Sequence, residues 1–294
     1  MLRRLPAVLS VIVVLSGTTR STATLAAGVS RPDPAAVAIA LTRDKLAIAP
    51  VQIGASGEHR FLIDTGSTST IVSERLAASL GLMPYATTTT LTVTGSYRAT
   101  VVTLPPLTIA GETFAGTTAS VAPLTALRDV DPLLEGILGQ DVLGRVNWLL
   151  DYRRKLLTLD SADRLSGDVT GSRIAARLIE ARPVVETAAA GAGVLRLVLD
   201  SAATHVLLFG NNSPTMVTQS ALLATNARTA SVTTARWPHL LLGRLRFTDV
   251  PVVLIPAPAT AGENGLLPTS LFSAVYFDNH HAEVVLNARL PHAP

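Results

Sequence analysis

The sequence predicts a mostly β chain folded as two related lobes with few short helices. Three observations carry this prediction. Short runs rich in Val, Ile, Leu and Thr alternate with Gly, Pro and Asn, a spacing typical of sandwiches and barrels. Sequence patterns recur in the same order in the two halves of the chain. Apolar residues make up 48% of the 294 residues and charged residues 15%, which excludes a disordered chain.

The predicted elements are short. The clearest strands are Lys45–Ile53, Thr90–Thr94, Arg98–Leu104, Val194–Leu199, Val252–Ile255 and Glu283–Asn287. Ser73 is a good N-cap for a helix that runs through Leu80 and closes at Gly81. Two further short helices are predicted at Gln140–Val146 and Thr269–Val275.

The internal repeat sets the predicted domain organisation. The run from Phe61 to Gly66 resembles the run from Leu197 to Ala202, 136 residues later. Gly136–Gly139 resembles Gly265–Pro268 at an offset of 129, and the stretch after each follows the same pattern. These matches predict one lobe over residues 35–160, a linker over 161–174 and a second, divergent lobe over 175–290.

Residues 1–27 have the form of a secretory signal peptide. Arg3 and Arg4 precede a short apolar run, Leu5–Leu15, and small residues follow it. The run is shorter than the roughly 20 residues needed to span a bilayer, although an uncleaved anchor is the alternative. We therefore expect an exported protein, periplasmic or secreted, that is not stably inserted in a membrane once the signal is removed.

Composition excludes several classes of site. The chain has no Cys, so disulfides, thiolate metal sites and a cysteine nucleophile are excluded. Residues 1–27 hold three of the 24 basic residues and no acidic one, which leaves 21 basic and 21 acidic residues. No basic cluster with interleaved aromatics occurs, so we expect no nucleic-acid partner. His280 and His281 are interpreted as part of a solvated turn, and we expect no metal.

The chemistry is predicted at two turns. Asp64 follows three apolar residues and precedes Thr65, Gly66 and Ser67, as at the end of a strand that stops in a tight turn. Asp200 follows a similar run and precedes Ser201 and Ala202. From the residues alone, a turn aspartate that bonds its own backbone is about as good an interpretation of Asp64 as a catalytic role.

The whole pattern resembles the retropepsin-like aspartic peptidases of bacteria, within the pepsin and retropepsin superfamily. The matching residues are Phe61–Ser67, the segment Gly136–Leu143 and the hairpin-like run Asp151–Leu159. The resemblance covers the first lobe and, more faintly, the second. It implies two pseudo-twofold-related β-barrel lobes of the acid-protease type.

The resemblance also implies the site. Asp64 and Asp200 would be the catalytic pair, supported by Thr65, Gly66, Ser67, Ser201 and Ala202. The neighbouring segment Ile137, Leu138 and Gly139 would lie beside the first turn. A hairpin turning at Gly95 and Ser96, with Tyr97 beside the turn, would cover the substrate, although Tyr97 fits an ordinary strand position equally well.

The implied activity is an aspartic endopeptidase that needs no cofactor. Two carboxyl groups in near contact share one proton and activate water for attack on a peptide bond. The expected substrate is an extended polypeptide with apolar residues near the cleaved bond, at acidic pH. A monomer is favoured over a homodimer because one chain carries both Asp residues.

The second turn departs from the family pattern. Ala202 stands where the family has Gly, Ala203 lacks the hydroxyl of Ser67, and Pro268 stands at the position of Gly139. These departures leave two alternatives open. One is a weakened or inactive pseudopeptidase that binds peptides between the lobes. The other is a peptidase made by the first lobes of two chains.

Overall fold

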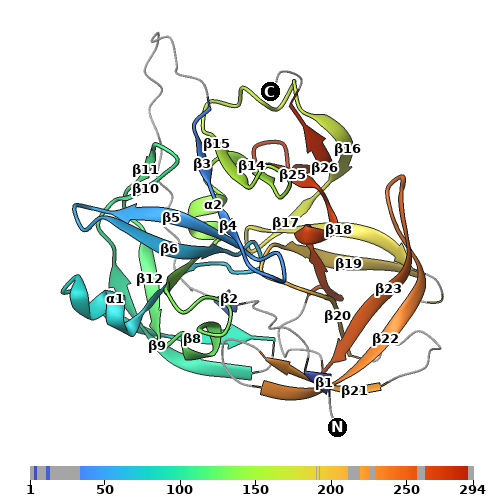
Figure 1. Cartoon of the computed structure of the whole chain (residues 1–294), viewed down its shortest axis with the longest axis horizontal. Helices are drawn as coiled ribbons and strands as arrows, with labels where there is room; N and C mark the ends of the chain where they lie inside the picture. Colours follow the sequence, from blue (N-terminus) through green and yellow to red (C-terminus); the bar gives the residue numbers. More distant parts are fainter. Residues whose placement is uncertain are drawn as a thin grey trace.

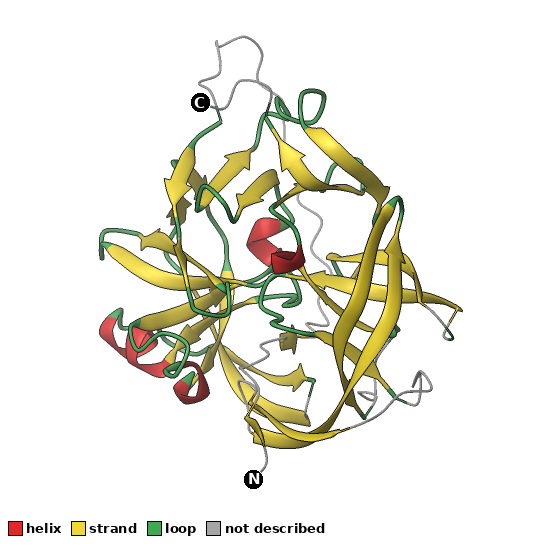
Figure 2. Cartoon of the chain, turned by 45° about the vertical axis from the view of Figure 1, so that its right-hand side comes forward, coloured by secondary structure: helices red, strands yellow, loops and turns green. Residues whose placement is uncertain are grey.

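The structure is mostly β with few short helices, as predicted (Figures 1 and 2). The computed structural model describes residues 3–4, 11–13, 34–93, 95–189, 191, 193–210, 219–224, 229–256 and 262–290. Most of the predicted signal segment, 1–27, lies outside these ranges. Within them, no helix has the length and apolar character needed to cross a membrane.

Three sheets contain all the strands of the described residues. In Figure 1 an 11-stranded sheet lies on the left and a nine-stranded sheet on the right, with a six-stranded sheet above them. The 11-stranded sheet contains β2 (Val11–Val13), β4 (Ala40–Leu41), β5 (Ala47–Ile53), β6 (Glu58–Ile63), β7 (Thr70–Ser73), β8 (Ala86–Thr92), β9 (Gly95–Thr103), β10 (Leu107–Ile109), β11 (Glu112–Phe114), β12 (Thr118–Ala122) and β13 (Leu134–Leu138).

The nine-stranded sheet closes on itself. It contains β1 (Arg3–Arg4), β17 (Arg177–Ile179), β18 (Arg182–Ala189), β19 (Gly193–Asp200), β20 (Val206–Phe209), β21 (Gln219–Ala224), β22 (Thr229–Leu242), β23 (Leu245–Ile255) and β24 (Gly265–Pro268). Six of them form a ring in the order β18, β19, β24, β20, β23 and β22, because β22 also pairs with β18. Two barrels were expected. One closed six-stranded barrel is formed by the described strands, while the pairings of the 11-stranded sheet follow an open path.

The six-stranded sheet joins segments from both halves of the chain. It contains β3 (Ala36–Ala38), β14 (Asn147–Asp151), β15 (Leu156–Asp160), β16 (Thr170–Ala175), β25 (Ala274–Asp278) and β26 (Glu283–Arg289). At its centre β14 pairs with β25, and the fully buried rings of Trp148 and Phe277 stack there at 4.2 Å between centroids. The segment expected as a linker, 161–174, therefore includes most of β16.

Four short helices interrupt the strands in the part of the chain that the structure describes. They are α1 (Glu74–Ser79), η1 (Thr125–Leu127), α2 (Gln140–Leu143) and η2 (Thr269–Leu271). The cap prediction for α1 is confirmed, since the Ser73 side chain accepts from the N–H of Leu76 and Gly81 has a φ of +62°.

The two other helix predictions were too long. The prediction for Gln140–Val146 was wrong after Leu143, where α2 ends. Thr269–Val275 is wrong beyond the turn η2, because Ala274 and Val275 pair with Asp151 and Leu150 of β14.

Gly265 permits a close approach between two strands of the barrel. A Cβ on this residue would lie 1.9 Å from the carbonyl oxygen of Leu207, far inside contact distance. A Cβ on Gly262, in contrast, would have no atom within 4 Å. The barrel can therefore close at β24 only with a glycine there.

We predict that Gly265→Ala lowers the free energy of unfolding by about 1–3 kcal/mol, because β20 and β24 must separate to admit the methyl group. Gly262→Ala serves as the matched control and should change it by less than about 0.5 kcal/mol. Urea unfolding followed by circular dichroism measures both. Equal stabilities of the two variants would contradict the close approach.

Candidate active site

The first predicted turn follows β6 and buries Asp64 completely. The Asp64 Oδ1 atom accepts hydrogen bonds from the backbone N–H groups of Gly66, at 2.9 Å, and Ser67, at 3.0 Å. The Asp64 N–H donates to the carbonyl of Leu138 on the neighbouring strand at 3.0 Å. Both the side chain and the backbone of Asp64 are therefore fixed by the strand ends around it.

The second turn holds Asp200 in the same way. Asp200 ends β19, is fully buried, and accepts from the N–H groups of Ala202, at 2.7 Å, and Ala203, at 3.1 Å. Each half of the chain thus supplies one buried carboxyl group, and each group is held by two backbone donors that follow it.

The expected weakness of the second turn is not found in its hydrogen bonds. Neither Gly66 nor Ala202 has a positive φ, so the backbone at Ala202 does not require the glycine of the family pattern. The Ala202 side chain is buried in an apolar cluster with Leu62 and Ile71 of the first half. The Ser67 hydroxyl, which Ala203 lacks, donates to the carbonyl of Ser69 rather than to Asp64.

The residues after the two carboxyl groups bond each other reciprocally. The Thr65 hydroxyl donates to the carbonyl of Leu199 at 2.7 Å, and the Ser201 hydroxyl donates to the carbonyl of Ile63 at 2.7 Å. The Ser201 N–H donates to Thr65 Oγ1 at 2.9 Å, and the Thr65 N–H donates to Ser201 Oγ at 3.1 Å. These four buried bonds hold the two turns against each other.

The environment favours a shared proton between the two carboxyl groups. Burial raises the pKa of Asp64 well above its ordinary value of 3.8, and the charge of Asp200 raises it further. Burial also raises the pKa of Asp200 to about 7, while its two backbone donors, Arg182 and a hydrogen bond with Asp64 act against the rise. Two carboxyl groups this close do not both ionise near neutral pH.

The neighbouring apolar segment lies where it was expected. Leu138 pairs with Ile63, and Ile137 pairs with Leu62, in the parallel pairing of β13 with β6. Gly139 begins α2, and a Cβ on it would lie 2.4 Å from the backbone of Ser69. In the second half, Pro268 pairs with Asp200 and begins only the single turn η2.

The hairpin that was expected to cover the substrate is formed by β8 and β9, but the prediction of its turn at Gly95 and Ser96 was wrong. β8 and β9 pair from Ala86 and Val101 to Thr92 and Gly95, so residues 93 and 94 connect them. Thr94 lies outside the described residues. Gly95 and Ser96 therefore belong to β9, with Gly95 at a φ of +150°. The turn lies two residues earlier than predicted because the cross-strand register continues to Gly95.

The hairpin reaches both halves of the chain. Val93, at its end, is buried in an apolar cluster with Val198 and Ala203 of the second half. Tyr97 packs against the cluster that contains Ala202, and burial raises its pKa. The hairpin thus packs against residues next to the second turn.

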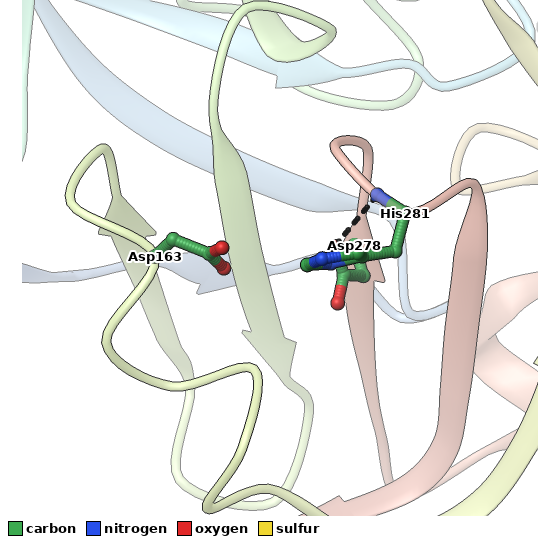
Figure 3. A group of neighbouring side chains, drawn as sticks. All are labelled: Asp163, Asp278 and His281. Atoms are coloured by element: carbon green, nitrogen blue, oxygen red, sulfur yellow. Dashed lines mark hydrogen bonds and ion pairs between the residues drawn. The ribbon is translucent and has the colours of Figure 1, made fainter.

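Two histidines and two carboxylates meet elsewhere in the fold. The turn between β25 and β26 holds His280 and His281, and ligand atoms of Asp163, Asp278 and His281 lie within 4.8 Å of one another (Figure 3). Asp278 already accepts from His281 and from Ser166 and Asn147, while Arg173 lies 3.8 Å away. Both carboxylate oxygens of Asp278 are therefore already bonded to protein donors, with the Arg173 cation nearby.

Two further residues near Asp64 and Asp200 were not predicted from the sequence. Arg182 is fully buried and bonds Glu263, and its charge acts on both Asp residues. The buried Tyr152 hydroxyl bonds Thr269, and burial raises its pKa, with a smaller contribution from the charge of Asp200. The repeat offset of 136 residues, which relates Asp64 to Asp200, also relates Leu46 to Arg182 and was the signal that could have revealed Arg182.

We predict that Thr65→Ala lowers the free energy of unfolding by about 2–4 kcal/mol, because it leaves the Ser201 N–H and the Leu199 carbonyl buried without partners. Thr65→Ser keeps the hydroxyl and should lose less than about 1 kcal/mol. Chemical denaturation of both variants tests the reciprocal bonds. Equal losses in the two variants would show that the methyl group rather than the hydroxyl matters.

Part of the first half of the chain matches a known protein family. Residues 49–142 match the family model described as aspartyl protease, which includes Asp64 and Gly139. A crystal structure of a retropepsin-like aspartic protease from Rickettsia conorii is 24% identical over 42% of this chain and 89% of its own, with a TM-score of 0.30. A search of curated proteins found no match. Over residues 49–142, about a third of its length, the chain is thus similar to the aspartyl protease family.

Proposed function

We propose that the protein is an aspartic endopeptidase that hydrolyses polypeptides with water activated between Asp64 and Asp200 of one chain. The observation that carries the proposal is the pair of buried carboxyl groups, each held by two backbone donors at the end of a strand. The match of residues 49–142 to the aspartyl protease family model supports it from the first half.

A pseudo-twofold relation between lobes 35–160 and 175–290 is part of the proposal. Thr65 and Ser201, 136 residues apart, make equivalent bonds to each other's strands. Trp148 pairs with Phe277, 129 residues later, at the offset that also relates Gly136 to Gly265. Pairing between residues related by the repeat supports an axis that passes between the two turns.

The proposed mechanism uses the one proton that the pair shares. The ionised carboxylate accepts a proton from a water molecule, whose oxygen attacks the peptide carbonyl carbon. The protonated carboxyl group donates to the carbonyl oxygen, which gives a neutral tetrahedral diol. Proton transfer to the nitrogen of the leaving amine and cleavage of the C–N bond then yield a carboxylic acid and an amine. The fixed backbone donors keep both carboxyl groups oriented throughout.

Substrate reaches the pair when the hairpin β8–β9 moves. Asp64 and Asp200 are fully buried, and Val93 at the hairpin end is buried against the second half. The outer edge of β8 accepts an extended segment, since Val11–Val13 of this chain pair with it from Thr90 to Thr92. A peptide substrate pairing in the same manner would present its backbone to the hairpin.

Hydrogen bonds in the two turns argue against both alternatives, the inactive pseudopeptidase and the peptidase made by the first lobes of two chains. Full support of Asp200 by two backbone donors favours an active second half over a pseudopeptidase. Bonds between Thr65 and Ser201 of the same chain favour a monomeric site over one built from two first lobes. Export to the periplasm or the medium, directed by residues 1–27, completes the proposal.

We predict that Asp64→Asn and Asp200→Asn each reduce peptide cleavage by about 10³-fold or more, because either change removes one of the two carboxyl groups that share the proton. Asp129→Asn, at an exposed residue, is the matched control and should leave the rate unchanged. Cleavage of a mixed peptide library by the full chain and its variants, from pH 3 to 10, measures the effect.

Each other outcome identifies an alternative. Loss in Asp64→Asn alone would replace the proposed pair by a site between two first lobes. Absence of cleavage by a folded wild-type protein that binds peptides would replace the peptidase by a pseudopeptidase.

We predict that activity falls on the acid side near pH 7 rather than near pH 4. The pKa of Asp200 is raised to about 7 by burial, and that of Asp64 lies above its ordinary value, so below pH 7 the pair holds two protons and lacks a base. The family resemblance alone implies an acidic optimum. A pH profile of kcat/KM measures the acid limb, and a limb near pH 4 would contradict the effect of burial.

A further inference from the structure

A buried ion pair lies beside the two turns. The side chains of Arg182 and Glu263 are 2% and 1% exposed, and Nη1 of Arg182 donates to Oε1 of Glu263 at 2.7 Å. Glu180, which is half-exposed, receives a second bond from Arg182 at 3.3 Å. A guanidinium is rarely this buried in a protein unless it is paired.

The strand register directs Arg182 toward Asp200. In the antiparallel pairing of β18 with β19, Val184 lies opposite Val198. Arg182 lies two residues before Val184, and Asp200 lies two residues after Val198. Because the strands are antiparallel, these two residues are opposite each other and on the same face of the sheet as the two valines. Arg182 is thus the residue of β18 that faces the end of β19 at which the carboxyl group is held.

The first half has an apolar pair at the same register positions. Ile48 lies opposite Leu62, two residues before Asp64, so Leu46 has the position of Arg182. Gly136 pairs with Phe61 as Gly265 pairs with Leu197, so Leu134 has the position of Glu263. Leu46 and Leu134 are buried together in one apolar cluster. Only the second half thus places a charge pair next to its aspartate.

The ion pair is poorly suited to a purely stabilising role. Within the described part of the chain, Arg182 Nε and Glu263 Oε2 are buried without hydrogen-bond partners. Arg182 also follows a turn in which Glu180 and Ala181 have φ values of +51° and +62°, a region that disfavours residues other than glycine. A buried ion pair with unsatisfied atoms is often less stable than an apolar pair of similar volume, as at Leu46 and Leu134.

We propose that Arg182, held by Glu263, is a positioning residue that supplies a fixed positive charge to the Asp64–Asp200 pair and favours its singly ionised form. The proposal rests on the proposed peptidase function and goes beyond it, because it assigns the asymmetry of the two halves to a charge. Positive charge near a carboxyl group stabilises the carboxylate. The pair can therefore release its first proton although it is completely buried.

The groups around Arg182 determine the sign of the effect. Glu263 and Glu180 neutralise part of its charge, while Asp64 and Asp200 face it from the two turns and Tyr152 lies near Asp200. Arg182 acts to lower the pKa of both Asp residues, against the larger effect of burial. Its removal must therefore move the loss of the first proton to higher pH.

The test replaces both charges by the pair found in the first half. In the full chain, Arg182→Leu with Glu263→Leu should move the acid limb of the kcat/KM profile upward by about one pH unit. Arg182→Lys keeps the charge and should keep the limb within about 0.3 units of the wild type. Arg182→Gln with Glu263→Gln removes both charges but keeps groups that can form hydrogen bonds. This variant replaces the double leucine variant in the test if the latter does not fold.

A second readout needs no activity. Asp residues whose pKa is raised on folding stabilise the protein below about pH 4, and this contribution is lost as the pH rises through the folded pKa. In the uncharged variants the fall in the free energy of unfolding should extend to higher pH than in the wild type.

The two readouts separate the two claims. An unchanged acid limb or an unchanged fall in stability, in a folded uncharged variant, would overturn the role of Arg182. If the wild type cleaves no peptide at any pH, the proposed function fails while the stability measurement still decides on Arg182.

Discussion

The four hydrogen bonds between Thr65 and Ser201 and each other's strands are the interaction on which the site depends. They fix the ends of β6 and β19, and with them the two carboxyl groups. Because the bonds are buried, breaking one leaves polar groups that have no access to water. The two turns cannot separate without losing these bonds.

Burial and backbone donors act in opposite directions on the carboxyl groups. Burial in the protein interior disfavours two negative charges, whereas two N–H groups per turn favour them. The balance leaves one proton between Asp64 and Asp200 near neutral pH. Arg182 adds a fixed charge from the second half only. The asymmetry lies in the charges around the turns, since the turns themselves have matching hydrogen bonds.

The sequence predicted the two turns because local patterns determine them: an apolar run that ends in Asp, a hydroxyl residue and a small residue. It also predicted the strands and the N-cap at Ser73. It failed where pairing between distant segments decides the structure. Ala274 and Val275 had a helical pattern but pair with β14, and Gly95 had a turn pattern but continues the register of β9 with β8.

The consequence of the departures at the second turn also depended on the three-dimensional structure. Ala202 stands where the family has glycine, yet its φ is not positive and its methyl group packs against the first half. The repeat could have indicated the position of Arg182. Its partner Glu263, 81 residues away in sequence, becomes apparent only in three dimensions.

A titration of the Asp carboxyl carbons by ¹³C NMR tests the central claim most directly. We expect the signals of Asp64 and Asp200 to titrate in two coupled steps, both above the ordinary Asp pKa of 3.8. Replacing either residue by Asn should turn the other into a one-step titration. Independent titrations of the two residues near pH 4 would contradict a coupled, proton-sharing pair.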